Sequence, residues 1–326
     1  MIPKKYLVTG GLGFIGSALV KRLAEAGHLV RILDNGSRGS LERLGAAADS
    51  VEFLEADIRD ANAVMRAGRG IDAVCHLAYV NGTRFFYEQP ELVLEVGVKG
   101  IVNLLDSCMA GGIKEMFLAS SSEVYQIPPT VPTDESVPLI VPDVHNPRFS
   151  YSGGKIISEL MAIHYGRAFF DRVVVFRPHN VYGPDMGWDH VIPELVMRMR
   201  DLVATSDNPV SLPVQGTGQE TRAFIYISDF IEGLLQIMDG GEHLGVYNIG
   251  TTEQVTVERL ASEVGNYFGR AVRIVPGERR PGSTPHRCPD ITKVSALGFK
   301  PQYSLREGLE ATIRWYDENA HLRPTN

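Results

Sequence analysis

The sequence of 326 residues has few cysteines, no long apolar run and no cluster of basic residues, and each absence excludes a class of protein. Its three cysteines, Cys75, Cys108 and Cys288, lie far apart and form no CxxC pair, so neither a disulfide framework nor a metal site is indicated. No apolar run approaches the ~18 to 20 residues that a membrane helix needs. The formal net charge is -7, and beyond the pair Arg279 and Arg280 no basic patch is available to bind nucleic acid.

The composition is that of an ordinary soluble globular protein, with 44% hydrophobic and 22% charged residues. Its length predicts two domains, or one large domain with a smaller lobe. The start, MIPKKYLVTGG, enters the first predicted strand almost at once and leaves no room for a signal peptide. We therefore expect a cytoplasmic protein.

What the chain does have is a glycine-rich turn near its start. The sequence KYLVTGGLGFIG is a short apolar run followed by Gly10, Gly13 and Gly16, which open a predicted helix. Glycines let a backbone approach a pyrophosphate, and a helix N-terminus supplies unpaired N–H groups and partial positive charge. Asp34 follows a second apolar run at about the distance where a carboxylate meets a ribose hydroxyl. The first third of the chain is predicted to bind a dinucleotide; Asp34 favours NAD over NADP, although Arg38 nearby leaves NADP open.

Short β-type runs alternate with helical runs over the first 180 residues. We expect strands at residues 6–8, 30–33, 53–55, 73–77, 116–119 and 173–176, and helices at residues 14–26, 61–67, 92–109 and 152–169. Such alternation predicts an α/β protein with a Rossmann-type doubly wound parallel sheet and a smaller C-terminal α/β substrate-binding lobe.

The same pattern predicts a division of the chain into two parts. Residues 1–180 are expected to form the NAD-binding domain, to which a strand and a helix within residues 223–250 return. Residues 181–326 are expected to form mainly the substrate-binding lobe. We expect helices at residues 191–202, 257–268 and 305–318, and a helix that ends near 238, with strands at 223–227, 246–249 and 272–275. Proline and glycine make the rest of segments 180–219 and 276–289 loops or short elements that line a site.

Tyr151 and Lys155 stand four residues apart in YSGGK at a predicted helix start, so they share one helix face. A phenol with a pKa near ~10 is a poor base, but an adjacent ammonium and a nicotinamide charge both favour the phenolate. Tyr151 would then take a proton from a sugar hydroxyl as hydride leaves its carbon. Lys155 would lower the pKa of Tyr151 and hold the nicotinamide ribose.

Together these motifs resemble the extended short-chain dehydrogenase/reductase superfamily, specifically the NAD-dependent nucleotide-sugar epimerases and dehydratases. The resemblance covers essentially the whole chain. Its matching segments are VTGGLGFIG, Asp34, Ala56-Asp57-Ile58, His76-Leu77-Ala78, LASSSEVY, YSGGK, RPHNVYGP, ETRAFIYISD and RPGSTPHRCPDITKVSALGFKP.

The resemblance implies roles for named residues. Catalysis falls to Ser121, Tyr151 and Lys155, where Ser121 helps to polarise the reacting sugar oxygen. The implied NAD contacts are Gly10, Gly13, Phe14, Ile15, Gly16, Asp34, Asn35, Asp57, Ile58, Leu77, Ala78, Tyr151, Lys155 and Pro178. The implied substrate contacts are Asn81, Ser122, Asn180, Arg222 and Arg280, of which the last three suit a diphosphate because they offer amide and cationic donors.

Glu123 is a further catalytic candidate that bears on the reaction. A plain 4-epimerase needs no second carboxylate, whereas enzymes that abstract the C5 proton or handle a C6 carboxylate often carry an acid here. The order Ser121-Ser122-Glu123-Val124-Tyr125 resembles UDP-glucuronate decarboxylases and sugar 4,6-dehydratases, although Ser122 replaces the acidic aspartate of the dehydratases. Glu123 as a loop residue that faces solvent or caps Lys114 is the alternative.

We therefore expect an enzyme that binds NAD and epimerises a nucleotide-diphosphate sugar at C4, with a UDP-hexose or UDP-uronate as the favoured substrate. The 4,6-dehydratase and UDP-glucuronate decarboxylase reactions stay open as alternatives that use Glu123. A non-catalytic nucleotide-binding regulatory protein is the alternative of a different class.

The comparison with the family also shows departures and supports one further expectation. Relatives often have asparagine where this chain has Gly97, and a small residue where it has Tyr79. Relatives also pair through two long helices, and the helices expected at residues 92–109 and 152–169 carry more apolar positions than one stripe needs. We expect a homodimer.

Overall fold

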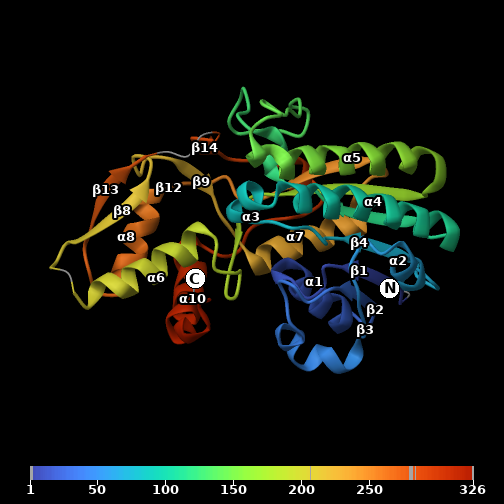
Figure 1. Ribbon diagram of the computed structural model, residues 1–326, viewed down its shortest axis with the longest axis horizontal. Coiled ribbons are helices and arrows are strands. Elements are labelled where there is room, and N and C mark those ends of the chain that lie inside the picture. The colour runs from blue at the N-terminus through green and yellow to red at the C-terminus, as the bar shows by residue number, and fades with distance from the viewer. Residues whose placement is uncertain (1–2, 206, 279–281, 283, 325–326) are drawn as a thin grey trace.

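A seven-stranded parallel sheet forms the centre of the larger of two lobes (Figure 1). The structure is a computed structural model that describes residues 3–205, 207–278, 282 and 284–324. The strands are β1 (Lys5–Thr9), β2 (Leu29–Asp34), β3 (Glu52–Glu55), β4 (Ala73–His76), β5 (Glu115–Ala119), β6 (Arg172–Pro178) and β11 (Gly245–Ile249). Their order in space is β11-β6-β5-β4-β1-β2-β3, and every pairing is parallel.

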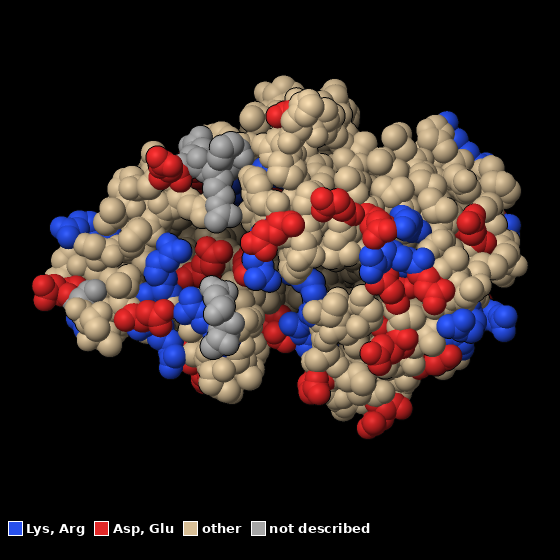
Figure 2. Space-filling model, viewed as in Figure 1, with Lys and Arg blue, Asp and Glu red and all other residues tan. Residues whose placement is uncertain are grey.

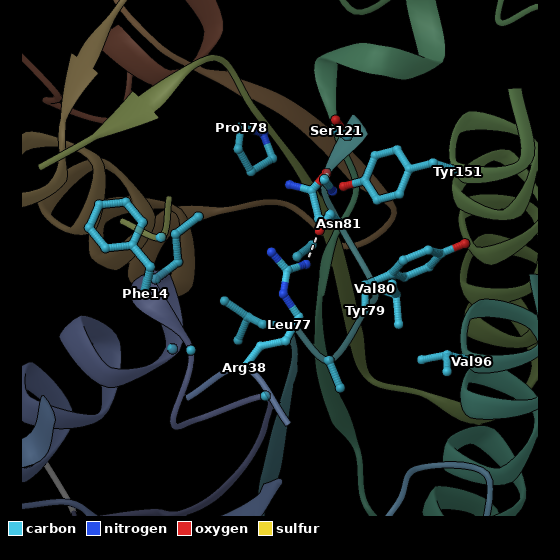
Figure 3. A pocket seen from close by; sticks show the side chains of 18 of the residues that line it. Phe14, Arg38, Leu77, Tyr79, Val80, Asn81, Val96, Ser121, Tyr151 and Pro178 are labelled. Atoms are coloured by element: carbon cyan, nitrogen blue, oxygen red, sulfur yellow. Dashed lines mark hydrogen bonds between the residues drawn. The ribbon is translucent and has the colours of Figure 1, made fainter. Parts of the chain in front are cut away.

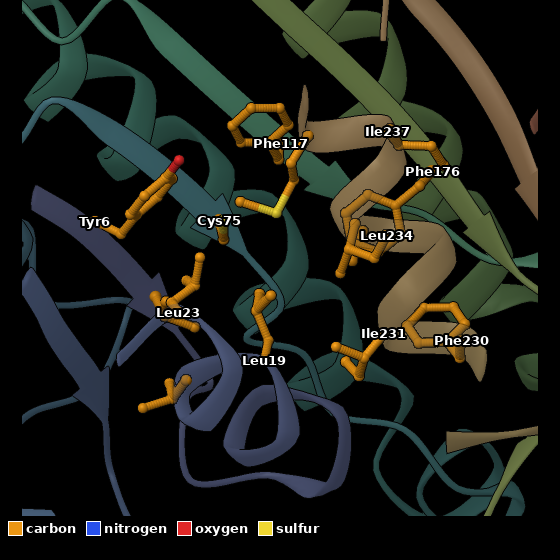
Figure 4. Packing of buried hydrophobic residues seen from close by; sticks show 14 of the residues in the cluster. Tyr6, Leu19, Leu23, Cys75, Phe117, Phe176, Phe230, Ile231, Leu234 and Ile237 are labelled. Carbon is orange, nitrogen blue, oxygen red and sulfur yellow. The ribbon is translucent and has the colours of Figure 1, made fainter. Parts of the chain in front are cut away.

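Helices cover both faces of this sheet, which explains why its strands are apolar on both sides. One face packs against α1 (Phe14–Glu25) and α7 (Ile227–Gly240), and the other against α2 (Ala61–Ala67), α4 (Pro90–Gly111) and α5 (Ser150–Phe169). Tyr6 belongs to the first core and its neighbour Leu7 to the second, as alternation along a strand requires. Figure 4 shows Leu19 of α1 and Leu234 of α7 packed in the first core.

Local sequence sets where the helices begin and end. The Asp60 side chain accepts hydrogen bonds from the backbone N–H groups of Asn62 and Ala63 and so caps α2. Helix α4 begins with Pro90 at its first turn and ends at Gly111, and the next residue, Gly112, caps it in a left-handed conformation with φ of 68°.

The sheet order reverses beside β1, and this places the candidate site. The chain runs from β1 to β2 and β3 on one side, then crosses to β4, β5, β6 and β11 on the other. In open parallel sheets, ligands bind at such a reversal, beyond the carboxyl ends of the strands. The glycine turn, residues 77–81, Ser121 and Asn180 all follow strand ends at this edge.

The smaller lobe has a core of its own. Helices α6 (Val191–Val203), α8 (Val257–Tyr267) and α10 (Leu305–Glu318) pack there with strands β8 (Val210–Gln215) and β13 (Val272–Gly277). Short strands join it to the larger lobe: β7 (Val181–Tyr182) with β10 (Ile225–Tyr226), and β9 (Thr221–Ala223) with β12 (Gln254–Thr256) and β14 (His286–Arg287).

The chain passes between the lobes repeatedly. After β6 it enters the smaller lobe, returns with α7 and β11, leaves again through β12 and α8, and returns through α9 (Thr292–Ser295) before α10. Val294 and Phe299 belong to the first core of the larger lobe, whereas Leu305 and Leu309 belong to that of the smaller.

The expected α/β class with a Rossmann-type parallel sheet is confirmed, and the expected helices and strands of the larger lobe lie within a few residues of those observed. Strand β8, helix α3 (Thr83–Glu88) and the 3-10 segment Leu41–Ser50 were not expected. Strand β8 alternates buried Val210, Leu212 and Val214 with more exposed residues, and Pro213 is tolerated because the strand lies in a two-stranded sheet. The domain boundaries at residues 180 and 181 stay a prediction.

No helix in the described part of the chain combines the length and the apolar character needed to cross a membrane.

Candidate active site

A cavity of about 440 Å³ lies at the carboxyl edge of the sheet, between the two lobes. Figure 2 shows this face of the molecule hollowed between the lobes, with acidic and basic side chains along the rim of the hollow. The volume suits an organic ligand of substantial size rather than a single ion.

The glycine turn forms a cradle at one end of the cavity. A Cβ atom on Gly10, whose φ is +73°, would lie 2.7 Å from the backbone nitrogen of Ala78, and one on Gly16 would overlap the carbonyl oxygen of Gly10. Gly13 caps α1 without a side-chain hydrogen bond, so the first N–H groups of the helix stay available to an anion. The loops after β1 and β4 therefore meet closely around a helix N-terminus that suits a phosphate.

Acidic side chains stand beside the cradle, where β2 and β3 end. The Asp34 carboxylate accepts hydrogen bonds from the N–H groups of Gly36 (2.9 Å) and Leu12 (3.0 Å), so it is fixed but can accept further donors. Asn35 donates to Asp57, and hydrogen bonds from Arg59 lower the pKa of Asp57 to about 2 although partial burial opposes them. These residues fit a dinucleotide whose ribose hydroxyls donate to Asp34.

Ser121 and Tyr151 lie beside each other in the cavity, and the Tyr151 hydroxyl points toward Ser121 (Figure 3). The Ser121 oxygen accepts a hydrogen bond from the Glu123 N–H at 3.1 Å, and its hydroxyl interacts with that of Tyr151, so a substrate oxygen placed between the two could accept the Ser121 proton. The Tyr151 ring stacks on Phe86, with centroids 5.0 Å apart. Burial raises the pKa of Tyr151, and the lowering by Ser121 and Arg38 does not outweigh it. The phenolate therefore needs a positive charge beyond those of the chain, such as that of a nicotinamide ring.

Lys155 lies one helical turn after Tyr151 and is almost fully buried. Its Nζ donates to the carbonyl oxygen of Ala119 at 2.6 Å and lies 4.0 Å from the centroid of the Tyr79 ring. Burial lowers the pKa of Lys155 to about 7, opposed by the charge of Glu159. The Glu159 carboxylate is itself bound by Arg177 at 2.7 Å, and Lys155 forms no ion pair with any of the described carboxylates. Lys155 therefore titrates near neutral pH.

Glu123 lies two residues after Ser121 in the cavity, in an ion pair. Its Oε1 accepts a hydrogen bond from Nη1 of Arg287 at 2.6 Å, and Arg148 approaches its other oxygen to 3.6 Å. Burial by itself would raise the pKa of Glu123, but the charge and hydrogen bond of Arg287, then Arg148 and Arg222, lower it to about 2. The alternative in which Glu123 faces solvent or caps Lys114 is wrong, since Lys114 donates to the carbonyl oxygen of Phe169.

The residues around Glu123 form what we call the arginine cluster: Arg148, Arg222 and Arg287. Arg287 on β14 and Arg222 on β9 are register partners, so both side chains leave their strands on the same face. Arg148 and Arg287 line the cavity. Three guanidinium groups around one carboxylate leave an excess of positive charge, which favours an anionic ligand.

The structure brings most of the predicted site residues together. The cavity is lined by Gly10, Gly13, Phe14, Ile15, Gly16, Asp34, Asn35, Asp57, Ile58, Leu77, Ala78, Asn81, Ser121, Ser122, Glu123, Tyr151, Lys155, Pro178 and Asn180. Arg222 is not among the lining residues, because its guanidinium donates to the carbonyl oxygens of Thr221, Thr284 and Pro285. Arg280 lies outside the described residues.

Several lining residues were not among the predicted site residues: Tyr79, Phe86, Arg148 and Arg287. Arg287 stands within the family-like tail RPGSTPHRCPD, and Arg148 stands three residues before Tyr151. Both could therefore have been proposed as site residues from their positions in these motifs. Phe86 carried no signal of its own, since an unplaced aromatic side chain most often fills a core, and Tyr79 was marked only as a departure from the family pattern.

Comparisons with known proteins agree with this geometry. Residues 6–250 match the sequence profile of a family described as the NAD dependent epimerase/dehydratase family. The chain is 33% identical to dTDP-4-dehydro-6-deoxy-D-allose reductase of Streptomyces bikiniensis over 319 residues, 95% of each chain. It is 31% identical to UDP-N-acetyl-alpha-D-glucosaminuronate decarboxylase of Bacillus cytotoxicus, over 97% of this chain and 99% of the relative.

A solved structure extends the likeness to the fold and the cofactor. The UDP-glucose 4-epimerase of Thermus thermophilus, in complex with NAD, superposes with a TM-score of 0.83 at 28% identity. The superposition covers 96% of this chain and 99% of the epimerase.

Proposed function

Because this chain belongs to the NAD dependent epimerase/dehydratase family, we propose that it is a nucleotide-diphosphate-sugar 4-epimerase, with a UDP-hexose or UDP-uronate as substrate. Family membership makes it an enzyme that uses NAD, so a purely regulatory nucleotide-binding protein is excluded. The identity of the sugar, the identity of the nucleotide and the outcome of the reaction are what we propose.

The first step is oxidation at C4 of the sugar. NAD, when bound in the cradle, supplies a reversible hydride acceptor. Ser121 donates a hydrogen bond to the C4 oxygen, and the Tyr151 phenolate takes the C4 hydroxyl proton as the C–H bond breaks. The ammonium of Lys155 favours the phenolate and holds the nicotinamide ribose. Return of the hydride to the opposite face of C4, with the proton given back to the C4 oxygen by Tyr151, inverts C4.

The observation that carries epimerisation as the outcome is the ion pair of Glu123. A 4,6-dehydratase needs a carboxylate that takes the C5 proton and an acid that assists departure of the C6 hydroxyl. Glu123 is held by Arg287, and its low pKa makes it a weak base. Ser122, which is buried beside it, is not an acid. Simple inversion at C4 needs neither group.

A second candidate is supported by the arginine cluster. Arg148 and Arg287 line the cavity next to Ser121 and Glu123, and a guanidinium group suits a C6 carboxylate as well as a phosphate. A uronate held there and oxidised at C4 becomes a β-keto acid, which loses CO2 readily. Decarboxylation is therefore the alternative outcome of the same first step.

One experiment separates these outcomes. Purified protein is incubated in D2O with UDP-glucose, UDP-galactose and UDP-glucuronate, and products are followed by NMR. We expect inversion at C4 with hydrogen retained at C5. Deuterium at C5 with loss of the C6 hydroxyl would identify a dehydratase, and a pentose with CO2 a decarboxylase. Stoichiometric consumption of added reduced cofactor would identify a reductase, the activity named for the Streptomyces relative.

We also propose that two copies pair through α4 and α5. Leu94, Ile157 and Leu160 on these helices are 39%, 39% and 54% exposed, and together they form an apolar face. Large apolar side chains on adjacent helices favour burial against a second subunit. Light scattering at micromolar concentration should give the mass of a dimer, and a monomer mass would exclude a stable pair. The cytoplasmic location stays a prediction.

A further inference from the structure

Tyr79 occupies a position that the proposed function does not use. It follows β4, and its ring meets that of Tyr151 edge to face, with centroids 5.1 Å apart. Its hydroxyl is buried and has no hydrogen-bond partner among the described residues. Figure 3 shows this hydroxyl pointing away from the cavity, whereas that of Tyr151 points into it. The part of Tyr79 that faces the site is therefore its ring.

Two helical glycines leave space for the end of that ring. A Cβ atom on Gly97 of α4, or on Gly154 of α5, would overlap the Tyr79 hydroxyl. Glycine in the interior of a helix is destabilising relative to alanine. Two such glycines that contact one side chain indicate that the ring must sit between these helices.

The face of the ring completes the surroundings of a buried cation. The Lys155 ammonium has three N–H groups, one of which donates to the carbonyl oxygen of Ala119. Its Nζ lies 4.0 Å from the centroid of the Tyr79 ring, within the range of a cation–π interaction. This interaction is strongest where water is excluded, and Lys155 is 3% exposed. A third N–H group remains for a ligand.

We propose that Tyr79 is a positioning residue: its ring, seated between Gly97 and Gly154, holds the Lys155 ammonium in place beside Tyr151. The inference rests on the proposed function, because Tyr79 acts through the two residues to which that function assigns proton transfer. The hydroxyl takes no part, so phenylalanine should serve as well as tyrosine. A residue without an aromatic face should not.

The first test compares Tyr79→Phe with Tyr79→Leu, using the UDP-sugars named above and measuring kcat and KM. We expect Phe to keep kcat within about twofold and Leu to lower it about tenfold, with KM changed less than about twofold. A leucine variant with the kcat of the wild type would overturn the proposal. So would a phenylalanine variant as impaired as leucine, because it would assign the effect to the hydroxyl.

Binding of NAD+ supplies a readout that does not depend on turnover. In calorimetry, Tyr79→Leu should weaken NAD+ binding several-fold in the wild-type background, and less than about twofold in Lys155→Met. Equal weakening in both backgrounds would show that the ring only fills space. If no UDP-sugar reacts but this pattern holds, the proposed function fails and the role of Tyr79 stands. If a sugar reacts and the Leu variant matches the wild type in both measurements, the role of Tyr79 fails alone.

A matched pair of glycines tests the seating of the ring. Gly154→Ala should lower kcat about tenfold, because the new methyl group displaces Tyr79. Gly153→Ala, one residue earlier on the same helix, should keep kcat, because its Cβ would meet nothing closer than the Val141 side chain at 3.6 Å. In the Tyr79→Leu background, Gly154→Ala should add less than about twofold. A full additional tenfold loss of kcat in that background would contradict the placement of the ring against Gly154. If Gly154→Ala fails to fold, the comparison of Tyr79→Phe with Tyr79→Leu decides the proposal.

Discussion

Two neighbouring parts of the cavity hold buried charge in opposite ways: an aromatic end, formed by Tyr79, Tyr151 and Lys155, and the arginine cluster beside Glu123. At the aromatic end, Lys155 lies against the ring of Tyr79 and one carbonyl oxygen, without an ion pair to any of the described carboxylates, and its pKa falls to about 7. At the arginine cluster, Glu123 is paired directly with Arg287 and its pKa falls to about 2. The first arrangement leaves a proton easily exchanged near neutral pH, and the second keeps a charge fixed. We therefore expect proton transfer at the aromatic end and electrostatic binding at the arginine cluster.

The largest expected effect tests the aromatic end. Tyr151→Phe removes the proton acceptor and keeps the ring volume, so kcat should fall by ~10² or more while NAD+ affinity is little changed. Steady-state kinetics with the UDP-sugar substrate, and calorimetry with NAD+, check both parts. Tyr165→Phe, on the same helix but outside the cavity lining, is the control and should be close to wild type. Near-normal turnover in Tyr151→Phe would remove Tyr151 from the mechanism.

The next effect concerns stability at the arginine cluster. The pKa of Glu123 is lowered from 4.5 to about 2 in the folded chain, so its ion pair stabilises the fold above pH 4.5. This contribution is lost as the pH falls toward 2. Urea unfolding should show Glu123→Gln less stable than wild type by on the order of 2 kcal/mol near neutral pH, with a difference that shrinks below pH 4.5.

The control for this measurement is Glu310→Gln, which breaks the exposed pair with Arg314 on α10. A surface pair of that kind contributes roughly 0 to 1 kcal/mol. A stability difference for Glu123→Gln that stays constant from neutral to acid pH would show that its ion pair is not the source.

Asp34 offers a smaller effect at the cofactor cradle. Wild type should bind NAD+ at least about tenfold more tightly than NADP+, or about 1.4 kcal/mol, because the carboxylate accepts from a ribose diol and repels a 2′-phosphate. Asp34→Ala should narrow that preference, as measured by calorimetry with both cofactors. Equal affinities in the wild type would refute the ribose assignment and direct attention to Arg38.

The smallest expected effect is on the kcat of Glu123→Gln, which we compare with that of Tyr151→Phe. If Glu123 acts as a fixed charge, Glu123→Gln should lower kcat less than about tenfold and should leave C5 hydrogen in place in D2O. This is well below the loss expected for Tyr151→Phe. A stalled variant that accumulates NADH would instead make Glu123 a proton-transfer group and favour dehydration.

More of the aromatic end than of the arginine cluster could be predicted from the sequence, because the motifs that form the aromatic end are local in the chain. Tyr151 and Lys155 are four residues apart on one helix, and the glycine turn is one continuous segment, so spacing alone predicts their geometry. The contact between Glu123 and Arg287 spans 164 residues and depends on the pairing of β9 with β14. No periodicity reports such a register.

Tyr79 shows the same limit from another side. The sequence marks it, with Gly97, as a departure from the family pattern, but its contact with Lys155 exists only once β4, α4 and α5 are assembled. Strand β8 was missed because a short alternation interrupted by Pro213 looks like a loop until its partner β13 is known.

The repeated passage of the chain between the lobes has a mechanical consequence. Several covalent connections join the two lobes, so any motion of one lobe relative to the other must bend all of these connections together. A single proteolytic cut in one connection would leave the lobes attached through the others. For the same reason, neither lobe can be excised as one continuous segment, since the core of each is completed by residues that come from the chain after it has visited the other.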